Sequence, residues 1–465
     1  MTIAARFSSS ISLLSQSYQK IRFGTFGTHS TKIQTDSYLF KKEKNNSRAS
    51  LLKHQQHRTS ISMTGVVHQD ENDRMGFGEN QAIKVSKSSA KLVPCTELRA
   101  CGERLRQGGI VAFPTETVYG LGCNALDTSA IIKVFEAKER PLTDPLISHV
   151  TESQVAFDLW AAEADSLEEE ALRSLCEQFW PGPLTLVAKA APEVPSILMA
   201  NTGFCACRSP KHPISIALIN AAKVPIAAPS ANKFGHVSPT RSSHVWHDLQ
   251  HEDVWIVEEE EEEENVKTSC CEVGVESSVA KIEMIEGSEK GQITLLRQGA
   301  VSLRDIEECL IKAGLANHFE VLALTKNATN ETVANVAPGQ TIRHYSPDVP
   351  SFILSRALCN LATSSSPSDI DKAFLSKSVL IDFGGRIKAW KDLALAYRDL
   401  SKTTNSAEAT KGVFETLRWA EKIQEADHIL FPEISEDSSL DALTLALKDR
   451  LTRAASGTVI DCLSI

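Results

Sequence analysis

Long apolar runs and aromatic residues are scarce in this sequence of 465 residues, in which Phe, Trp and Tyr together make up 6%. A membrane-spanning helix needs roughly 18 to 20 consecutive apolar residues, and even the segment ISLLSQSY is interrupted by polar side chains. The apolar fraction of 42% and the charged fraction of 23% are those of a soluble globular protein. A chain of this length predicts two or three domains, and we expect no contact with a membrane.

Closely spaced cysteines are also rare. Eleven cysteines are present, and their only close pairs are Cys205 with Cys207 and Cys270 with Cys271. Zinc sites usually need C-x₂₋₄-C or comparable His spacing, which is absent here, and no secretory signal points to a disulfide framework. We therefore expect reduced, mostly buried thiols and no metal ion held by the protein itself.

Several well-known catalytic signatures are missing. The sequence has no G-x-S-x-G elbow, no H-E-x-x-H pair and no G-x-x-x-x-G-K-[ST] phosphate loop. The segment YGLG is a glycine turn that lacks the rest of a dinucleotide fingerprint. These absences argue against α/β-hydrolase, zinc-protease and P-loop chemistry.

Charge is distributed unevenly along the chain. Residues 1–63 contain ten Lys or Arg residues but only two acids, Asp36 and Glu43. A basic, Ser-rich leader with so few acids is typical of a mitochondrial or chloroplast transit peptide, and a disordered basic tail is the alternative. Met63 could start a shorter form that remains in the cytoplasm.

The rest of the chain is strongly acidic, because the whole sequence carries a net charge of −10 although its leader is basic. The densest acidic run, residues 258–264, predicts a solvated insertion because like charges repel. An RNA-binding module stays open as an alternative function. Binding to a phosphate backbone needs clustered Lys and Arg residues, however, and the acidic portion has no such stripe.

Alternating strand and helix patterns predict an α/β protein with helices on the faces of a largely parallel sheet. We expect a flexible segment at 64–92, a first domain at 93–323, a linker at 324–350 and a second α/β domain at 351–465. The strand at 110–113, a helix capped by Thr128 or Ser129 and the strand at 146–150 read as a βαβ unit. In the second domain, DLALAYRDL is predicted to be helical.

Polar residues gather at the ends of these elements. Lys138 and Arg140 lie where Pro141 ends a helix, and two such cations suit a polyphosphate or a carboxylate. Ser230 and Asn232 follow the buried strand PIAAPS, at the edge where open α/β sheets place ligands. Each signal is weak alone, since helix ends and turns favour these residue types anyway. The residues by themselves indicate an anion pocket.

Taken in order, these segments resemble the threonylcarbamoyl-AMP synthases, the YrdC-like family, in their longer two-domain form. The resemblance covers roughly residue 95 to the C-terminus. It is carried by FPTETVYGLG, K-x-R-P, PL-I-x-H, R-x-P-x-HP, APSAN, S-P-T, G-x-ES, LLR-x-G and the linker segment APGQTIRHYSP. It implies a twisted open α/β sheet domain followed by a smaller, Rossmann-like α/β domain.

The resemblance implies a reaction in which L-threonine, bicarbonate and ATP, with Mg²⁺ on its phosphates, give threonylcarbamoyl-adenylate and pyrophosphate. A partner transferase would then use the adenylate to modify tRNA, and direct tRNA binding is a further expectation. A carbamoyl-adenylate-forming domain of a carbamoyltransferase is an alternative function, although such proteins carry zinc-finger cysteine pairs that this chain lacks.

The resemblance also assigns roles to individual residues. The catalytic tetrad would be Lys138, Arg140, Ser230 and Asn232. Threonine would be held by Thr115, Thr117, His149, Arg208, Ala228 and Ser277. ATP would contact the tetrad together with Asp144, Ser238, Arg297, His344 and Tyr345.

The chain departs from the family pattern at Asp144 and Phe204, at the acidic insertion before G-x-ES, and at Gln340 and Ile342 of the linker. The family often has Asn where Asp144 stands, and a carboxylate near a triphosphate would repel it unless it points away or meets Mg²⁺. A Thr is common where this sequence has Phe204, which puts a side-chain contact to ATP at that position in doubt.

N-terminal sequencing of the endogenous protein tests the leader. We expect an organellar form that begins near residue 64 and a cytoplasmic form that begins at Met63, because a transit peptide is removed after import. An organellar form that still begins at Met1 would contradict the transit peptide.

Overall fold

The computed structural model describes residues 89–259, 271–324, 335–337, 344–364, 368–435 and 441–463. The predicted leader, most of the predicted flexible segment, residues 260–264 of the acidic run and most of the linker lie outside these ranges. No helix in the described ranges is both long and apolar enough to cross a membrane.

The first sheet has eleven strands and mixes parallel with antiparallel pairs. In the order in which they pair, the strands are β1 (Lys91–Pro94), β8 (Val254–Glu258), β2 (Ile110–Phe113), β3 (Gly120–Asn124), β7 (Ile226–Ala227), β4 (Ile147–His149), β6 (Phe204–Arg208), β5 (Leu184–Lys189), β9 (Ser278–Met284), β10 (Gly291–Arg297) and β11 (Phe319–Ala323).

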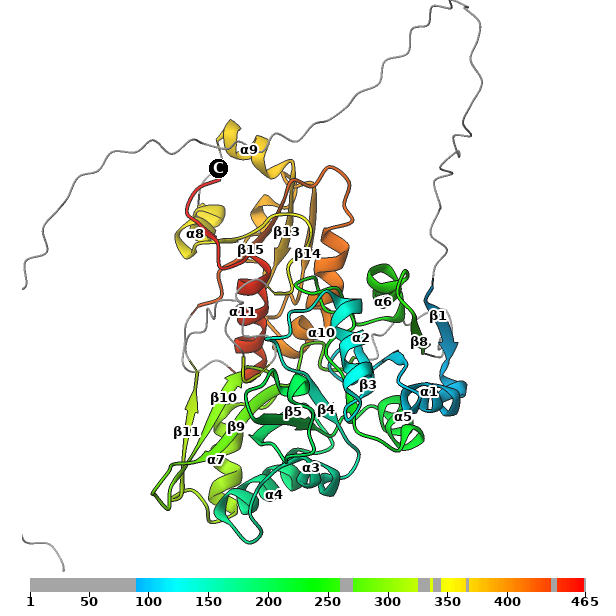
Figure 1. The fold of residues 1–465 in the computed structure, drawn as a ribbon. Coiled ribbons are helices and arrows are strands. Elements are labelled where there is room, and N and C mark those ends of the chain that lie inside the picture. Colours follow the sequence, from blue (N-terminus) through cyan, green and yellow to red (C-terminus); the bar gives the residue numbers. More distant parts are fainter. Residues whose placement is uncertain are drawn as a thin grey trace, which may run out of the picture. The chain divides into compact units, whose positions relative to one another are not determined.

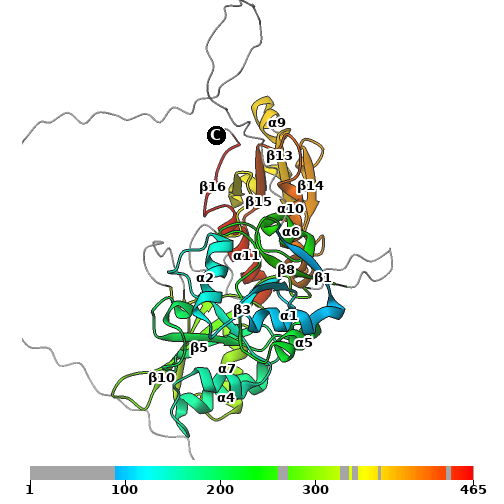
Figure 2. The same ribbon diagram turned by 45° about the vertical axis from the view of Figure 1, so that its right-hand side comes forward.

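Helices cover both faces of this sheet. They are η1 (Cys95–Glu97), α1 (Leu98–Arg106), α2 (Thr128–Lys138), α3 (Ser153–Leu159), α4 (Leu167–Phe179), η2 (Ser196–Met199), α5 (Pro213–Ala222), α6 (Ser242–Leu249) and α7 (Leu303–Lys312). Figures 1 and 2 show α1 beside α5, and α4 beside α7.

Strand β2, third from one edge of the sheet, is buried on both faces. Because side chains alternate along a strand, Ile110 and Ala112 join the core that contains α2 and α4, whereas Val111 and Phe113 join the core that contains α1 and α5. This explains why the run IVAF is apolar at every position.

The predicted βαβ unit is wrong. The segment GLGCN, which the sequence presented as a glycine turn, forms β3 and runs antiparallel to β2. It reverses the chain before α2, so β4 pairs with β7 and β6 and not with β2. The first sheet is therefore mixed, not largely parallel. At Gly122 a Cβ would lie 2.8 Å from side-chain atoms of both Ile226 and Phe113, so only glycine fits this crowded strand.

Three smaller predictions also need correction. The cap of α2 is Asp127, which accepts from the N–H groups of Ser129 and Ala130, and not Thr128 or Ser129. Strand β1 begins at Lys91, inside the segment predicted to be flexible. Strand β8 extends to Glu258, and the next acid, Glu259, accepts a hydrogen bond of 2.7 Å from the Tyr119 hydroxyl. The acidic run therefore begins within ordered structure.

The second sheet is parallel, as predicted, and has five strands. They pair in the order β14 (Ala396–Asp399), β13 (Ser378–Asp382), β15 (His428–Pro432), β12 (Ser351–Leu354) and β16 (Val459–Ile460). Its helices are α8 (Arg356–Ser364), α9 (Asp369–Leu375), η3 (Lys388–Trp390), α10 (Ser406–Ala420) and α11 (Ala442–Ala454).

Alternating side chains again fill two cores. Val379 and Ile381 of β13 pack with α10 and α11, whereas Leu380 packs with α8 and η3. The predicted helix DLALAYRDL is wrong, because its second half forms β14 against β13. Pairing with a buried neighbouring strand outweighs the weak helical preference of so short a segment.

The two sheet domains share one hydrophobic core. Val118, Val237 and Val275 of the first domain lie in the same buried cluster as Phe414 of α10 and Leu447 of α11. A buried ion pair adds to this contact, since both terminal nitrogens of the Arg418 guanidinium donate to the Asp248 carboxylate, at 3.0 and 2.9 Å.

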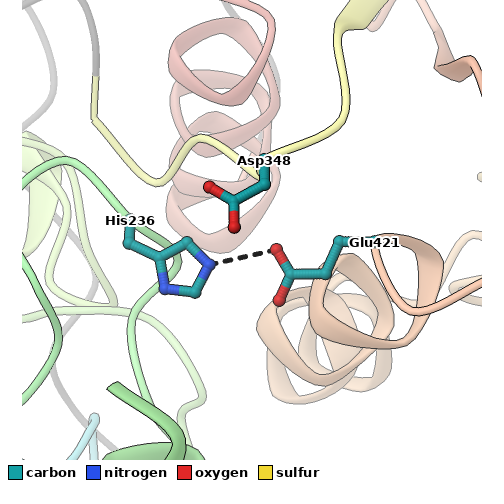
Figure 3. A group of neighbouring side chains, drawn as sticks. All are labelled: His236, Asp348 and Glu421. Atoms are coloured by element: carbon teal, nitrogen blue, oxygen red, sulfur yellow. Dashed lines mark hydrogen bonds and ion pairs between the residues drawn. The ribbon is translucent and has the colours of Figure 1, made fainter. Parts of the chain in front are cut away.

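His236 extends this contact (Figure 3). Its Nδ1 lies 2.8 Å from Asp248 and its Nε2 lies 3.0 Å from Glu421, which follows α10. Asp348 approaches the same point, and one ligand atom from each of His236, Asp348 and Glu421 falls within 4.8 Å of the others. Burial alone would lower the pKa of His236, but the bonds to Asp248 and Glu421 raise it to about 9. The ring is therefore a cation that bridges two carboxylates, a state that opposes metal binding.

The raised pKa of His236 makes this contact pH-dependent. Its stabilisation is complete below the unfolded-state value of about 6.5 and is lost as the pH rises through about 9. Between pH 6.5 and 9.5 we therefore expect the melting temperature of the native protein to fall more steeply than that of His236→Gln. Melting curves of the two proteins across this range test the prediction, and parallel pH dependences would contradict it.

Candidate active site

Most of the residues singled out in the sequence lie around one pocket, which is partly open to solvent. Its lining comes from loops and strand ends of the first sheet and from the described end of the linker. The lining residues are Thr115, Thr117, Val118, Gly120, Arg140, Ile147, His149, Arg208, Ala228, Pro229, Ser230, Glu276, Ser277, Arg297, His344 and Tyr345.

The end of α2 positions the two predicted cations. The helix stops at Lys138, and Glu139 turns the chain with φ of 55°. The buried Lys138 ammonium then donates to the backbone carbonyls of Ser230 and Asn232. Burial and the neighbouring Arg140 hold the pKa of Lys138 well below its usual range. Lys138 thus braces the loop that presents Ser230 to the pocket.

Arg140 lies in the pocket wall and is locked in place. Its Nε donates to the Asp144 carbonyl at 3.0 Å and its Nη2 donates to the Pro145 carbonyl at 2.8 Å. Asp144 Oδ2 also lies 3.0 Å from Nη2, and both side chains are buried. The acid that the sequence flagged as a source of repulsion is therefore the counterion of Arg140.

The segment PTET forms a second wall. Thr115 donates to the Val118 carbonyl and lies 2.8 Å from the hydroxyl of Thr117. Arg208 donates to Thr117 Oγ1 at 2.9 Å and to Glu116 Oε1 at 2.6 Å. Burial raises the pKa of Glu116, but Arg208 outweighs it and the net shift is downward. Glu116, which the sequence did not single out, is thus a buried carboxylate that fixes Arg208.

His149 lies in the floor of the pocket, where Phe113 meets it edge-on with ring centroids 6.3 Å apart. Burial and the Arg208 charge lower its pKa to about 3. It is therefore neutral near pH 7 and offers hydrogen bonds without adding positive charge. Ala228 lies beside it in the lining, with its N–H bonded to the Ile147 carbonyl.

Arg297, the last residue of β10, is held against Ser277, which directly precedes β9. Arg297 donates to the Ser277 carbonyl at 2.9 Å and to its hydroxyl at 3.0 Å, and Thr185 lies 2.8 Å from the same hydroxyl. Burial lowers the pKa of Arg297 from its usual value. Ser277 is therefore oriented from two sides.

Ser238 contacts the pocket wall indirectly, through Glu276, which the sequence alone did not single out. Its hydroxyl donates to Glu276 Oε1 at 2.6 Å, and Glu276 lines the pocket although Ser238 does not. The other oxygen of Glu276 accepts from Arg450 Nε at 2.9 Å. The E of the G-x-ES motif is thus a wall residue that is tied to the second domain.

His344 and Tyr345 enter the pocket from the linker side. Their rings meet at 4.1 Å, and Tyr345 packs on Phe414 with centroids 5.3 Å apart. Among the described residues, His344 Nδ1, the Tyr345 hydroxyl oxygen and Asn232 Oδ1 are buried without a hydrogen-bond partner. Buried polar atoms usually have partners, so these three favour a ligand with polar groups.

The structure therefore brings the predicted residues to one place. Four of them stand behind the lining and do not form part of it: Lys138, Asp144, Asn232 and Ser238. Phe204, whose contact to ATP was in doubt, packs under the Lys281 ammonium at 3.9 Å and does not line the pocket. The described cysteines are free thiols, most of them buried, as expected.

Fold and pocket together define an α/β protein whose buried cations and hydroxyls are arranged to bind an anionic ligand. The family described as telomere recombination (Sua5/YciO/YrdC) matches residues 103–299, and the threonylcarbamoyl-AMP synthase C-terminal domain matches residues 301–456. The chain belongs to the threonylcarbamoyl-AMP synthase family. It is therefore an enzyme of the nucleotidyltransferase class.

Relatives in three organisms support this assignment. The chain is 30% identical to the threonylcarbamoyl-AMP synthase of Schizosaccharomyces pombe over 74% of its own length and 85% of the relative. It is 31% identical to that of Bacillus subtilis over 77% and 92% of the two chains. The structure of Pyrococcus abyssi Sua5 complexed with L-threonine matches with a TM-score of 0.62 at 30% identity, covering 80% of this chain and 99% of the other.

Removing Glu116 tests the electrostatics of the pocket. Glu116→Ala leaves the buried Arg208 without its counterion, which should lower the free energy of unfolding by roughly 3–5 kcal/mol. Urea denaturation of the variant measures the loss. The exposed Glu193→Ala is the control and should change stability by less than about 0.5 kcal/mol. A loss below about 1 kcal/mol for Glu116→Ala would mean that the pair is not held as described.

Proposed function

We propose that this pocket takes L-threonine, bicarbonate and ATP and releases threonylcarbamoyl-adenylate and pyrophosphate. The observation that carries the proposal is the convergence of Arg140, Ser230, Arg208, Ser277 and Arg297 on one buried pocket. The relatives of the chain are threonylcarbamoyl-AMP synthases, and one related structure holds L-threonine.

The chemistry requires positioning more than a covalent nucleophile. The threonine amine adds to carbon dioxide with release of a proton, or to bicarbonate with release of water, and forms a carbamate. A carbamate oxygen then attacks the α-phosphorus of ATP, a new P–O bond forms, and the bond to pyrophosphate breaks. Charge on the phosphates grows as the leaving group departs, so fixed cations in a dry site lower the barrier.

The threonine end of the pocket is the PTET side. The hydroxyls of Thr115 and Thr117, the fixed Arg208 and the doubly bonded Ser277 suit an amino acid that carries a carboxylate and a hydroxyl. A neutral His149 beside them suits the reacting amine, because a histidine cation would repel an ammonium group and a neutral ring would not.

The nucleotide end is the side of Arg140 and Arg297. Lys138, whose pKa lies well below its usual range, braces the Ser230 loop from behind the lining. His344, Tyr345 and Asn232 each hold a buried polar atom that lacks a partner among the described residues, and these atoms suit the polar groups of a nucleotide.

Mg²⁺ fits this site as an ion carried by ATP. The carboxylate in the lining is that of Glu276, and its two oxygens already accept from Ser238 and Arg450. Asp144, behind the lining, is paired with Arg140. The phosphates of ATP would therefore supply most of the ligands, as is usual for Mg²⁺, and the ion would neutralise phosphate charge.

We further propose that the adenylate passes to a transferase that modifies tRNA. The family membership of the chain supports this step. We also propose that residues 1–63 direct the protein to a mitochondrion or chloroplast, because they are basic, Ser-rich and almost free of acids.

Production of the adenylate tests the proposal. The purified chain with Mg²⁺, ATP, L-threonine and ¹³C-bicarbonate should form labelled threonylcarbamoyl-adenylate, detected by mass spectrometry, and one pyrophosphate per adenylate. Arg140→Ala and Lys138→Ala should each lower kcat/KM by about 100-fold or more, because each removes a fixed cation from a dry site or from its support.

Lys133→Ala is the matched control. Lys133 lies on the same helix, α2, but donates to the Gly108 carbonyl outside the pocket. Its loss should leave kcat/KM within about twofold, since exposed polar contacts contribute little. The proposal fails if the native protein forms no adenylate, or if all three variants match it.

A further inference from the structure

Glu276 is a buried carboxylate in the pocket wall that depends on a cation from the other domain. Its side chain is nearly inaccessible, with Ser238 on one oxygen and Arg450 of α11 on the other. Burying a carboxylate is costly unless a cation and hydrogen bonds compensate it. Within the described residues, Arg450 is the cation that the ion-pair geometry assigns to Glu276.

The Arg450 side chain is fully buried, and its nitrogens contact several wall segments. Nε donates to Glu276 Oε2 at 2.9 Å and Nη1 donates to the Gln298 carbonyl at 2.8 Å. The guanidinium carbon lies 5.3 Å from the centre of the Tyr345 ring. One side chain of the second domain therefore touches the wall at Glu276, at Tyr345 and at the residue after Arg297.

The backbone around this contact leaves little room for adjustment. Gly274, two residues before Glu276, has φ of +75°, and a Cβ there would lie 2.4 Å from the backbone of Thr410 and Lys411 in α10. The loop that carries Glu276 is thus pressed against the second domain. Arg450 itself does not line the pocket.

We propose that Arg450 is a positioning residue of the active site, through which the C-terminal domain fixes the Glu276 carboxylate and the Tyr345 ring in the pocket wall. The identity of the ligands that this wall meets rests on the function proposed above. The guanidinium is suited to the task because its planar fork donates in several directions at once, which an ammonium group cannot reproduce.

The charges predict what the loss of Arg450 does. An uncompensated Glu276 carboxylate would face a pocket meant for phosphate and carboxylate groups, and like charges repel. Ligand binding should then weaken even if the protein stays folded. Neutralising Glu276 as well should remove the repulsion and restore part of the affinity.

The experiment compares Arg450→Met, Arg450→Lys, Glu276→Gln and the double variant Arg450→Met/Glu276→Gln in the full chain. Calorimetry measures Kd for ATP and for L-threonine, kinetics measure KM and kcat, and melting curves report folding. Arg450→Met should raise the Kd for ATP by about tenfold or more, the size expected when a buried charge loses its partner. Arg450→Lys should recover only part of this loss, and the double variant should bind ATP more tightly than Arg450→Met.

Arg418→Met is the matched control. Arg418 is also a buried arginine that links the second domain to the first, but its partner Asp248 does not line the active-site pocket. Its loss should lower the melting temperature as the loss of Arg450 does, yet leave both Kd values within about twofold, since its side chain contacts Asp248 and the Val237 carbonyl and no residue of the pocket lining.

Three results would overturn the proposal. The first is a folded Arg450→Met protein whose Kd values lie within twofold of the native ones. The second is an equal loss of affinity in Arg418→Met. The third is a double variant in which the separate effects of Arg450→Met and Glu276→Gln on Kd simply multiply. If the native protein binds ATP but forms no adenylate, the proposed function fails, whereas the Kd comparison still decides the role of Arg450.

Discussion

A carboxylate buried in a pocket wall requires a cation, and Glu276 meets that requirement with Arg450, more than 170 positions further along the chain. The contact ties the pocket to the second sheet domain. The apolar core also joins the pocket to the second domain. Val118, Val275 and Tyr345 near the site pack in one cluster with residues of α10 and α11. The second domain therefore supports the pocket wall through both polar and apolar contacts.

The same principle explains the rest of the site. Arg140 has Asp144, Arg208 has Glu116, and Arg297 is held by Ser277. Each pocket cation is fixed before a ligand arrives, so little side-chain entropy remains to be lost on binding. A site with fixed charges and no covalent nucleophile suits a reaction in which a carbamate displaces pyrophosphate, because such chemistry depends on orientation and on charge neutralisation.

Sequence patterns predicted the helices and strands whose apolar residues recur at regular spacing. The all-apolar β2, the helix α2 and the parallel second sheet followed from spacing and composition. Strand β3 was not predicted, because its glycines are typical of a turn. Strand β14 was not predicted either, because its strand conformation depends on pairing with β13. The motif residues followed from the family resemblance. Their counterions Glu116 and Arg450 could not be predicted, because long-range partners depend on the fold and not on local spacing.

The Glu276–Arg450 pair and the shared core imply that the first domain makes threonylcarbamoyl-adenylate only when the second domain completes the pocket wall. Side-by-side assays of the full chain and of a chain that ends at residue 350, with ATP, L-threonine and ¹³C-bicarbonate, test it most directly. We expect labelled adenylate from the full chain and at least about 100-fold less from the shortened one. Equal rates from the two chains would contradict it.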